Sequence, residues 1–432
     1  MSPELMALIL IGGLVVFLAL GVEIAVSMGI LASLGFILFS HDPQVQIPWT
    51  AWATLNSFVL LSMPLFIFMG TMFANTGVVR SLFNAADKWI GILPGGLASS
   101  VVVANAVFGA MCGSSIAAAA TFSAIAFPEM EKKGYDPKLA LGVICVGGTL
   151  SVLIPPSLIL IVYGAWEEQS VAKLFAAAMI PGIILATLLV ITVMIMALMN
   201  RSLTPQVAHY TWRERFIAIR DILPWAGVIA LVLGVIFGGV MTPTESSALG
   251  AFLSLVMSAA YRQMSYKALK NSLFTTVKVT AMIGFIIFTA RLLSFVFQAS
   301  GLTQSFAHIM SGLALGKYGV FTVIVILYLV LGCFLDTFSM MLLTFPFVMP
   351  LLTSLGFSPI WWGVTFVILA EIGVVTPPFG LNLFAIHGVL PRYSVMTIAG
   401  ASMPFLIPLL VMIAIMVAFP DLALWLPGVL YG

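Results

Sequence analysis

The stretch Gly147-Gly148-Thr149-Leu150-Ser151-Val152-Leu153-Ile154-Pro155-Pro156-Ser157 lies inside an apolar run long enough to cross a membrane. Two adjacent prolines break a helix, because each lacks an N–H group and its ring clashes with the carbonyl four residues back. We therefore predict a broken helix over 137–165, with Ile154 in an extended conformation. Lipid cannot satisfy the freed backbone groups, so they must face protein, water or a solute. The pattern recurs at 371–380, inside a second broken helix predicted over 359–389. Two such breaks are typical of a transport site.

The composition is that of a protein that crosses a membrane several times. Of 432 residues, 62% are hydrophobic and only 7% are charged, whereas soluble domains carry about 25% charged residues. A net charge of +2 is too small to indicate a nucleic-acid partner. The three cysteines all lie in apolar runs, which favours packing over disulfides or a metal site. No nucleophile–base set, histidine cluster or phosphate loop is present, so we expect no enzyme activity and no cofactor.

Apolar segments of sufficient length predict an all-α protein with about ten membrane crossings. The segments are 4–21, 24–40, 55–76, 137–165 (broken), 173–199, 222–241, 245–261, 279–299, 359–389 (broken) and 394–419.

Two further apolar stretches, 95–128 and 317–350, carry polar residues at their midpoints. Each arm has about 15 residues, or roughly 22 Å of helix, which is shorter than a hydrocarbon core of about 30 Å. We therefore predict two re-entrant helical hairpins. Their tips are Gly113-Ser114-Ser115 and Leu335-Asp336-Thr337.

A shift of 222 residues aligns the two halves of the chain. It places Pro128 on Pro350, Gly134 on Gly356, Pro137 on Pro359 and Pro155-Pro156 on Pro377-Pro378. We predict a first repeat over 1–200, a cytoplasmic interfacial connector over 201–221 and a second repeat over 222–432. Each repeat has five crossings and one hairpin. Because five is odd, the repeats have opposite orientations in the membrane, which is a transporter architecture.

The distribution of Lys and Arg predicts the orientation. Fourteen of these residues fall on one side of the ten crossings and two on the other, and Arg291 lies inside a span. The basic side is cytoplasmic by the positive-inside rule, so both termini are expected to be periplasmic. The first hairpin then enters from the cytoplasm and the second from the periplasm. The connector and segment 262–278 are basic and aromatic, which fits helices in the cytoplasmic interface or plain positive-inside anchoring.

The first hairpin tip carries two hydroxyls, Ser114 and Ser115. Hydroxyls and carbonyls at a helix end form an oxygen cage suited to Na⁺. The alternative is that the serines only cap the returning helix. The run Gly147-Gly148-Thr149 would bring the backbone close to this tip, and the carbonyls before Pro155 would be free to coordinate.

The second hairpin tip carries a carboxylate, Asp336, beside Thr337. A charge at membrane depth is costly and usually functional, so Na⁺ coordination or a proton relay would explain it. The alternative is a structural ion pair with Arg291. Further candidates near the second break are Glu371, Thr376 and Asn382, the last two flanking Pro377-Pro378.

Several motifs occur in a fixed order along the chain. They are 112–121 (CGSSIAAAAT), 127–130 (FPEM), Gly134-Tyr135, the 147–157 stretch, 376–380 (TPPFG) and Asn382. In this order they resemble the large membrane subunit of tripartite ATP-independent periplasmic (TRAP) transporters, over essentially the whole chain.

The resemblance implies import of an organic acid, such as a C4-dicarboxylate or sialic acid, driven by a Na⁺ gradient through an elevator mechanism. It implies two partners in the bacterial inner membrane system: a periplasmic substrate-binding protein and a small four-helix membrane subunit. It also implies two cation sites. Ser114, Ser115 and the 148–155 segment (Gly148, Thr149, Pro155) form one; Asp336, Thr337 and the 371–377 segment (Glu371, Thr376, Pro377) form the other.

Three other functions would leave different signals in the sequence. A stand-alone symporter of the dicarboxylate/sodium type would need no binding protein. A membrane enzyme should show a nucleophile and a base at equal depth. A passive channel would not need two polar hairpin tips.

Overall fold

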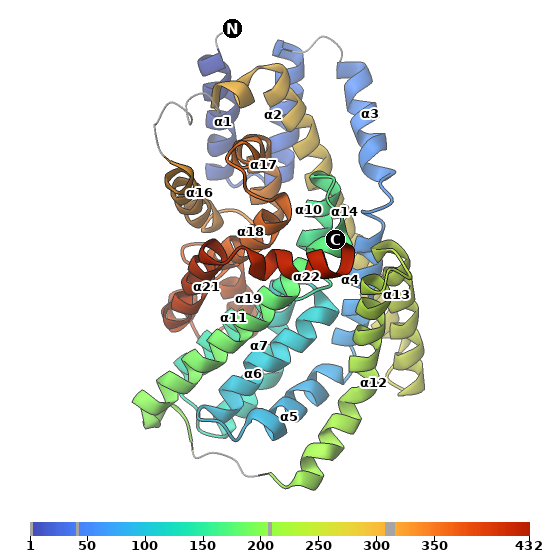
Figure 1. Ribbon diagram of the computed structural model, residues 1–432, viewed down its shortest axis with the longest axis vertical. Coiled ribbons are helices and arrows are strands. Elements are labelled where there is room, and N and C mark those ends of the chain that lie inside the picture. Colours follow the sequence, from blue (N-terminus) through green and yellow to red (C-terminus); the bar gives the residue numbers. More distant parts are fainter. Residues whose placement is uncertain (1–2, 40–42, 206–209, 307–315) are drawn as a thin grey trace.

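A computed structural model describes residues 3–39, 43–205, 210–306 and 316–432. These residues form α-helices and short 3₁₀ turns, and no β-strand occurs among them. Helices from the two halves of the chain lie side by side throughout the molecule (Figure 1). The predicted all-α fold is therefore confirmed.

The helices of the first half follow the order of the predicted segments. They are α1 (Pro3–Ala19), α2 (Ile24–Phe39), α3 (Pro43–Leu55), α4 (Ser62–Ala74), α5 (Val78–Ile90), α6 (Gly96–Cys112), α7 (Ser115–Lys132), α8 (Pro137–Gly147), α9 (Leu150–Leu153), α10 (Leu158–Trp166) and α11 (Val171–Met199).

The second half begins after a 3₁₀ turn at Arg201–Leu203. Its helices are α12 (Trp212–Phe237), α13 (Pro243–Ala260), α14 (Tyr266–Ala299), α16 (Lys317–Gly332), α17 (Thr337–Ser354), α18 (Pro359–Val374), α19 (Leu381–Val389), α20 (Val395–Ser402), α21 (Leu406–Ala418) and α22 (Asp421–Tyr431).

Five described helices are long and apolar enough to cross a membrane, and seven spans result if each of two bent helix pairs counts as one. The pair α4 and α5 bends by 69° and the broken helix around Pro155 by 41°. Several apolar helices, α1 and α2 among them, are shorter. The count of ten crossings therefore stays a prediction.

The predicted connector 201–221 is not separate from the span that follows it, because its last residues already belong to helix α12. Helix α12 starts at Trp212, with a capping box between Thr211 and Glu214, and runs without a break into the predicted span. Helix α14 likewise joins segment 262–278 to the next span. Side-chain caps at Thr211 and Ser265 explain where the two helices begin. Pro224 lies inside α12 without ending it. Residues 206–209 lie outside the described residues.

Both hairpin stretches consist of two helices joined by a tight turn. Helices α6 and α7 meet at Gly113-Ser114, where Gly113 adopts φ 63°, a left-handed conformation that favours glycine. Helices α16 and α17 meet at residues 333–336. Re-entry of these hairpins into a membrane stays a prediction.

Both proline pairs interrupt their helices, as the sequence predicts. The first helix stops at Leu153 and resumes at Leu158, and Ile154 is extended with φ −81° and ψ 122°. The second stops at Val374 and resumes at Leu381.

Small residues let each hairpin approach its broken helix. A methyl group on Gly109 in α6 would lie 2.4 Å from the Cα of Ser151. A methyl group on Gly373 in α18 would lie 2.5 Å from the Cα of Gly332 in α16. Such contacts leave no room for a side chain, so each hairpin and break pack backbone to backbone.

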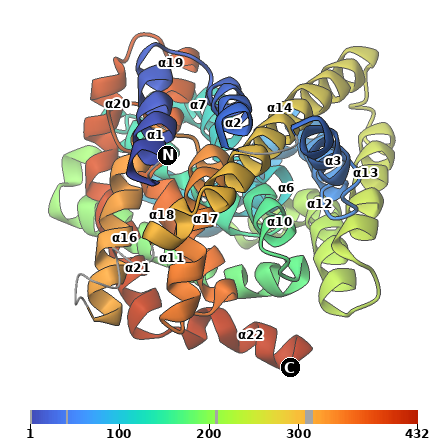
Figure 2. The same cartoon turned by 90° about the horizontal axis from the view of Figure 1, so that it is seen from above.

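Helix packing between the halves is reciprocal at the 222-residue offset. Helix α2 packs on α14 while its counterpart α13 packs on α4, and α8 packs on α20 while α18 packs on α11. The crossing of α2 and α14 is visible from above in Figure 2. Each half therefore completes its core with helices of the other half.

The contact at Gly373 generates a stability prediction. Gly373→Ala should lower the apparent melting temperature of the detergent-solubilised protein, since overpacking against backbone costs about 1–3 kcal/mol. Gly234→Ala in α12 is the matched control, because nothing lies within 4 Å of the added methyl group. Equal melting temperatures for the two variants would show that α16 and α18 do not pack this closely.

Candidate functional site

The first hairpin tip lies against the first helix break. Ser114 caps α7 by accepting a hydrogen bond from the Ala117 N–H at 3.4 Å, so the predicted capping role is present. A methyl group on Gly113 would lie 3.2 Å from the Pro156 carbonyl oxygen. One added to Gly148 would lie 3.0 Å from the Ser115 carbonyl oxygen. The glycine run thus brings backbone to the tip, as expected.

Ser115 joins the two halves of the chain. Its Oγ donates to Oε1 of Glu371 in α18 at 3.5 Å, and both side chains are buried. Oε2 of Glu371 has no hydrogen-bond partner among the described residues. Glu371 was expected beside the second hairpin, whereas the structure places it beside the first. A carboxylate in this setting needs a proton or a cation to neutralise it.

The first break contributes backbone and one hydroxyl. Thr149 is fully buried, and its Oγ1 donates to the Val146 carbonyl at 2.6 Å, which leaves the oxygen free to accept. Pro155 is buried as well. The side chain of Ser151 donates to the Asn105 carbonyl at 3.4 Å and so ties this break to α6.

At the second hairpin tip, Asp336 caps α17. Its Oδ1 accepts hydrogen bonds from the N–H groups of Phe338 at 3.0 Å and Ser339 at 3.1 Å. Thr337 is buried, and the Cys333 carbonyl accepts from the Phe379 N–H at 3.2 Å, which links this tip to the second break. The cap occupies one carboxylate oxygen, and Oδ2 remains available.

The polar residues of the second break point in different directions. Thr376 donates to the Ile372 carbonyl at 2.5 Å, within its own helix turn, and Pro377 is partly buried. Asn382 is fully buried and donates through Nδ2 to the Cys145 carbonyl of α8 at 3.2 Å. Its Oδ1 has no partner in the described chain. Asn382 therefore belongs with the first half rather than with the second hairpin.

Sequence reasoning missed Asn105 in α6. This residue is fully buried; its Nδ2 donates to the Val101 carbonyl at 3.0 Å, and its Oδ1 has no partner in the part of the chain described. Its side chain packs against Gly147, where a methyl group would lie 2.9 Å from Nδ2. An amide in the middle of the apolar stretch 95–128 is a signal that could have identified it.

Buried acceptor oxygens without donors are the chemical feature of this region. They are Oε2 of Glu371, Oδ1 of Asn382 and Oδ1 of Asn105. Buried acceptors require a donor, water or a cation, and oxygen ligands suit hard cations. No cluster of three His, Cys, Asp or Glu residues occurs in the described residues, so the ligand types there do not resemble a transition-metal site.

The predicted ion pair of Arg291 with Asp336 or Glu371 is wrong for the described structure. The guanidinium lies over the Trp166 ring, 5.7 Å from its centroid, and donates to the Ala165 carbonyl at 3.5 Å. Its surroundings are a polar pocket of about 380 Å³. The physical reason is that α14 places Arg291 beside the end of α10, away from the buried carboxylate.

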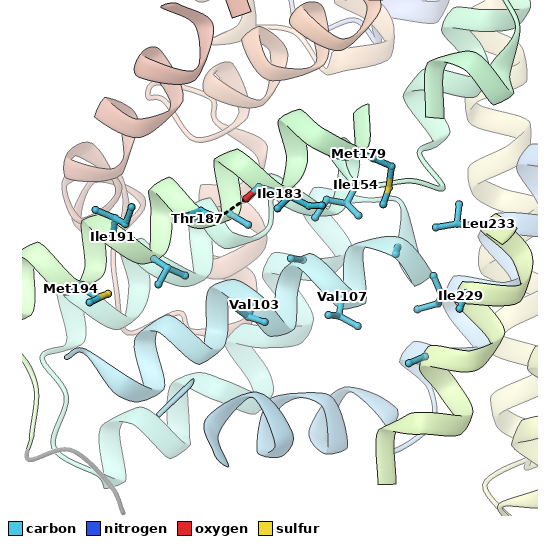
Figure 3. Close-up of a pocket in the computed structure, with 16 residues that line it drawn as sticks. Val103, Val107, Ile154, Met179, Ile183, Thr187, Ile191, Met194, Ile229 and Leu233 are labelled. Atoms are coloured by element: carbon cyan, nitrogen blue, oxygen red, sulfur yellow. Dashed lines mark hydrogen bonds between the residues drawn. The ribbon is translucent and has the colours of Figure 1, made fainter. Parts of the chain in front are cut away.

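An apolar cavity of about 650 Å³ lies between α6, α11 and α12, next to Ile154 at the first break (Figure 3). Its only polar lining side chain is Thr187, whose hydroxyl donates to the Ile183 carbonyl at 2.8 Å. No polar group is left to bind an acid. This cavity is therefore no candidate for a solute site.

The family model and the curated relatives agree on one family. Residues 11–422 match the model described as "Tripartite ATP-independent periplasmic transporter, DctM component". The chain is similar to the C4-dicarboxylate TRAP transporter large permease proteins of Pseudomonas aeruginosa, 34% identical over 93% of this chain and 94% of the relative, and of Vibrio cholerae, 32% identical over 100% and 99%. The solved structure of the Alcanivorax borkumensis YdaH transporter shares the fold, with a TM-score of 0.60 at 13% identity over 94% of this chain and 97% of that chain.

The buried carboxylate yields a stability prediction in sodium-free solution. Glu371→Gln removes the charge at nearly constant volume, so the variant should melt no lower than the wild type. Glu371→Ala also leaves a cavity and should be destabilised, by about 2 kcal/mol or more. Thermal unfolding in detergent checks both. A Glu371→Gln variant less stable than Glu371→Ala would show that the charge itself is paired in the folded protein.

Proposed function

The chain belongs to the family of the DctM component of tripartite ATP-independent periplasmic transporters, and we propose that it is the large permease of a system that imports an organic acid with Na⁺. The observation that carries the proposal is a pair of helical hairpins packed against two broken helices, with buried oxygen atoms that lack donors between them. Discontinuous helices of this kind supply solute and ion ligands in secondary transporters.

The proposed substrate is a small carboxylate. The two permeases named above carry C4-dicarboxylate in their names. Specificity would be set largely by a periplasmic binding protein that delivers the acid, and a small four-helix membrane subunit would complete the system. The family description is tripartite, and this favours the proposal over a stand-alone dicarboxylate/sodium symporter.

The proposed coupling ion is Na⁺, bound near both hairpin tips. At the first tip we assign Ser114, Ser115, Gly148, Thr149 and Pro155 to the site, together with Glu371. At the second tip we assign Asp336, Thr337, Thr376 and Pro377. Replacement of the hydration shell by such oxygens makes a buried cation tolerable. A carboxylate at each site would also compensate the charge.

The proposed movement is of the elevator type in an inverted repeat. The reciprocal packing of α2 on α14 and α13 on α4 supports two halves related by a pseudo-two-fold axis. Ser115 and Glu371 come from different halves, as do Asn382 and Cys145, so their hydrogen bonds support a single moving body made from both. Helices α2, α4, α13 and α14 would form the scaffold.

Replacement of the second-tip carboxylate tests sodium coupling. Asp336→Asn keeps the size and removes the charge, so transport should need much more sodium or fail. Ser115→Ala should shift the sodium dependence in the same direction by less, because a hydroxyl offers only a dipole. The measurement is initial uptake of succinate into proteoliposomes with the partner subunits, as a function of sodium concentration.

Asp421→Asn in α22 is the matched control for that experiment, because it removes an exposed carboxylate that belongs to neither hairpin nor to a broken helix. Its sodium dependence should equal that of the wild type. If Asp336→Asn behaves like this control, Asp336 is only a helix cap and the second sodium site must be withdrawn.

The proposed orientation is tested by labelling. Lys133 and Lys270 are exposed and lie on the basic side of the predicted topology. Cysteines at these positions, in a background without native cysteines, should react with a membrane-impermeant maleimide only after the cells are opened. Labelling of either cysteine in intact cells would reverse the orientation.

A further inference from the structure

The polar pocket around Arg291 has no role in the proposed sodium sites. It is formed by three elements: helix α3, the end of α10 with the following turn, and the last third of α14. None of its lining residues belongs to a hairpin. The side chains that concern binding are those of Gln46, Trp49, Trp166, Glu168, Arg291 and Gln298.

The guanidinium of Arg291 has hydrogen-bonding capacity to spare. It carries five N–H donors, and its only described hydrogen bond is the long contact to Ala165. No ion pair joins it to an acidic residue in the described ranges. Gln46 and Gln298 add amide donors to the same pocket. A partly buried, under-used cation surrounded by neutral donors is an arrangement that attracts an anion.

One acidic residue, Glu168, lines the pocket beside this cation. Glu168 lies on the exposed rim in a left-handed conformation with φ 54°, held by the hydrogen bond from the Gln169 N–H to the Gly164 carbonyl at 3.0 Å. Glu168 is therefore the one carboxylate among the lining residues, and it is the source of negative potential at the pocket.

We propose that this pocket binds the carboxylate group of a small organic anion, with Arg291 as the principal ligand. A guanidinium presents two parallel N–H groups that match the two oxygens of a carboxylate. The volume of about 380 Å³ lies within the usual range for small-molecule sites, and the indole of Trp166 supplies an apolar wall. The Glu168 carboxylate at the rim repels the anion, and this repulsion limits the affinity of the pocket for the anion.

The pocket lies between α14, a proposed scaffold helix, and the end of α10, which follows the first helix break. We therefore assign it to the transported acid, as a station occupied before the hairpin sites; this assignment rests on the proposed function. Because the pocket shares no lining residue with the hairpins, binding there requires no sodium. Sodium independence separates this site from the coupling sites.

The test is equilibrium binding of radiolabelled succinate to the purified full-length permease in sodium-free choline buffer. The wild type should bind saturably, and the uncharged analogue succinamide should not compete. Arg291→Gln should raise Kd by about tenfold or more, the loss expected for a charge-assisted bidentate contact. Arg291→Lys keeps the charge but not the bidentate geometry. Its Kd should lie between those of the wild type and Arg291→Gln.

Two variants control for indirect effects. Glu168→Gln should bind succinate more tightly than the wild type, because a like charge is removed; a structural disturbance of the pocket would weaken binding. Lys317→Gln removes an exposed cation outside the pocket and should leave Kd unchanged.

The outcomes decide the proposal. Absence of saturable binding, an unchanged Kd in Arg291→Gln, weaker binding in Glu168→Gln, or an equal loss in Lys317→Gln would each overturn the site. Sodium-driven uptake is measured on the same permease reconstituted with its partner subunits. If uptake fails while Arg291-dependent binding persists, the proposed function is wrong and the site stands; if uptake persists and binding does not depend on Arg291, only the site is wrong.

Discussion

The structure depends on one constraint: backbone groups freed inside a membrane must find partners within the protein. The two proline pairs free such groups, and neighbouring segments satisfy or cover them. The Cys333 carbonyl accepts from the Phe379 N–H, and the Val375 carbonyl accepts from the Ser402 hydroxyl at 3.2 Å. Glycines at the contacts of hairpin and break allow this approach. The breaks and the hairpins therefore depend on one another: each hairpin covers backbone groups that a break leaves free.

The same packing concentrates polar side chains where solvent is excluded. Ser115 and Glu371 meet across the two halves, and Asn382 reaches the backbone of α8. In a low-dielectric interior such groups interact strongly when paired and are costly when unpaired. Their unpaired oxygens are consequently the strongest physical argument for a bound cation.

The two cavities differ in chemistry, and the difference follows from their walls. The cavity beside Ile154 is lined almost wholly by apolar side chains of α6, α11 and α12. The pocket at Arg291 is lined by amides, indoles and charges. A charged side chain within a predicted span is stable only with such a polar environment. The position of Arg291 in α14, beside the end of α10, thus explains both its isolation from Asp336 and the polarity around it.

The sequence alone determined the features that depend on local chemistry. Proline pairs broke both helices, low charge and long apolar runs indicated a helical membrane protein, and the ordered motifs identified the family. Tertiary structure decided which side chains meet. Glu371 pairs with Ser115 instead of residues near Asp336, and Asn105 takes part although no motif marked it. The spacing of apolar residues indicates which face of a helix is buried. It does not indicate which helix covers that face, because contacts between the halves join helices that are more than two hundred residues apart.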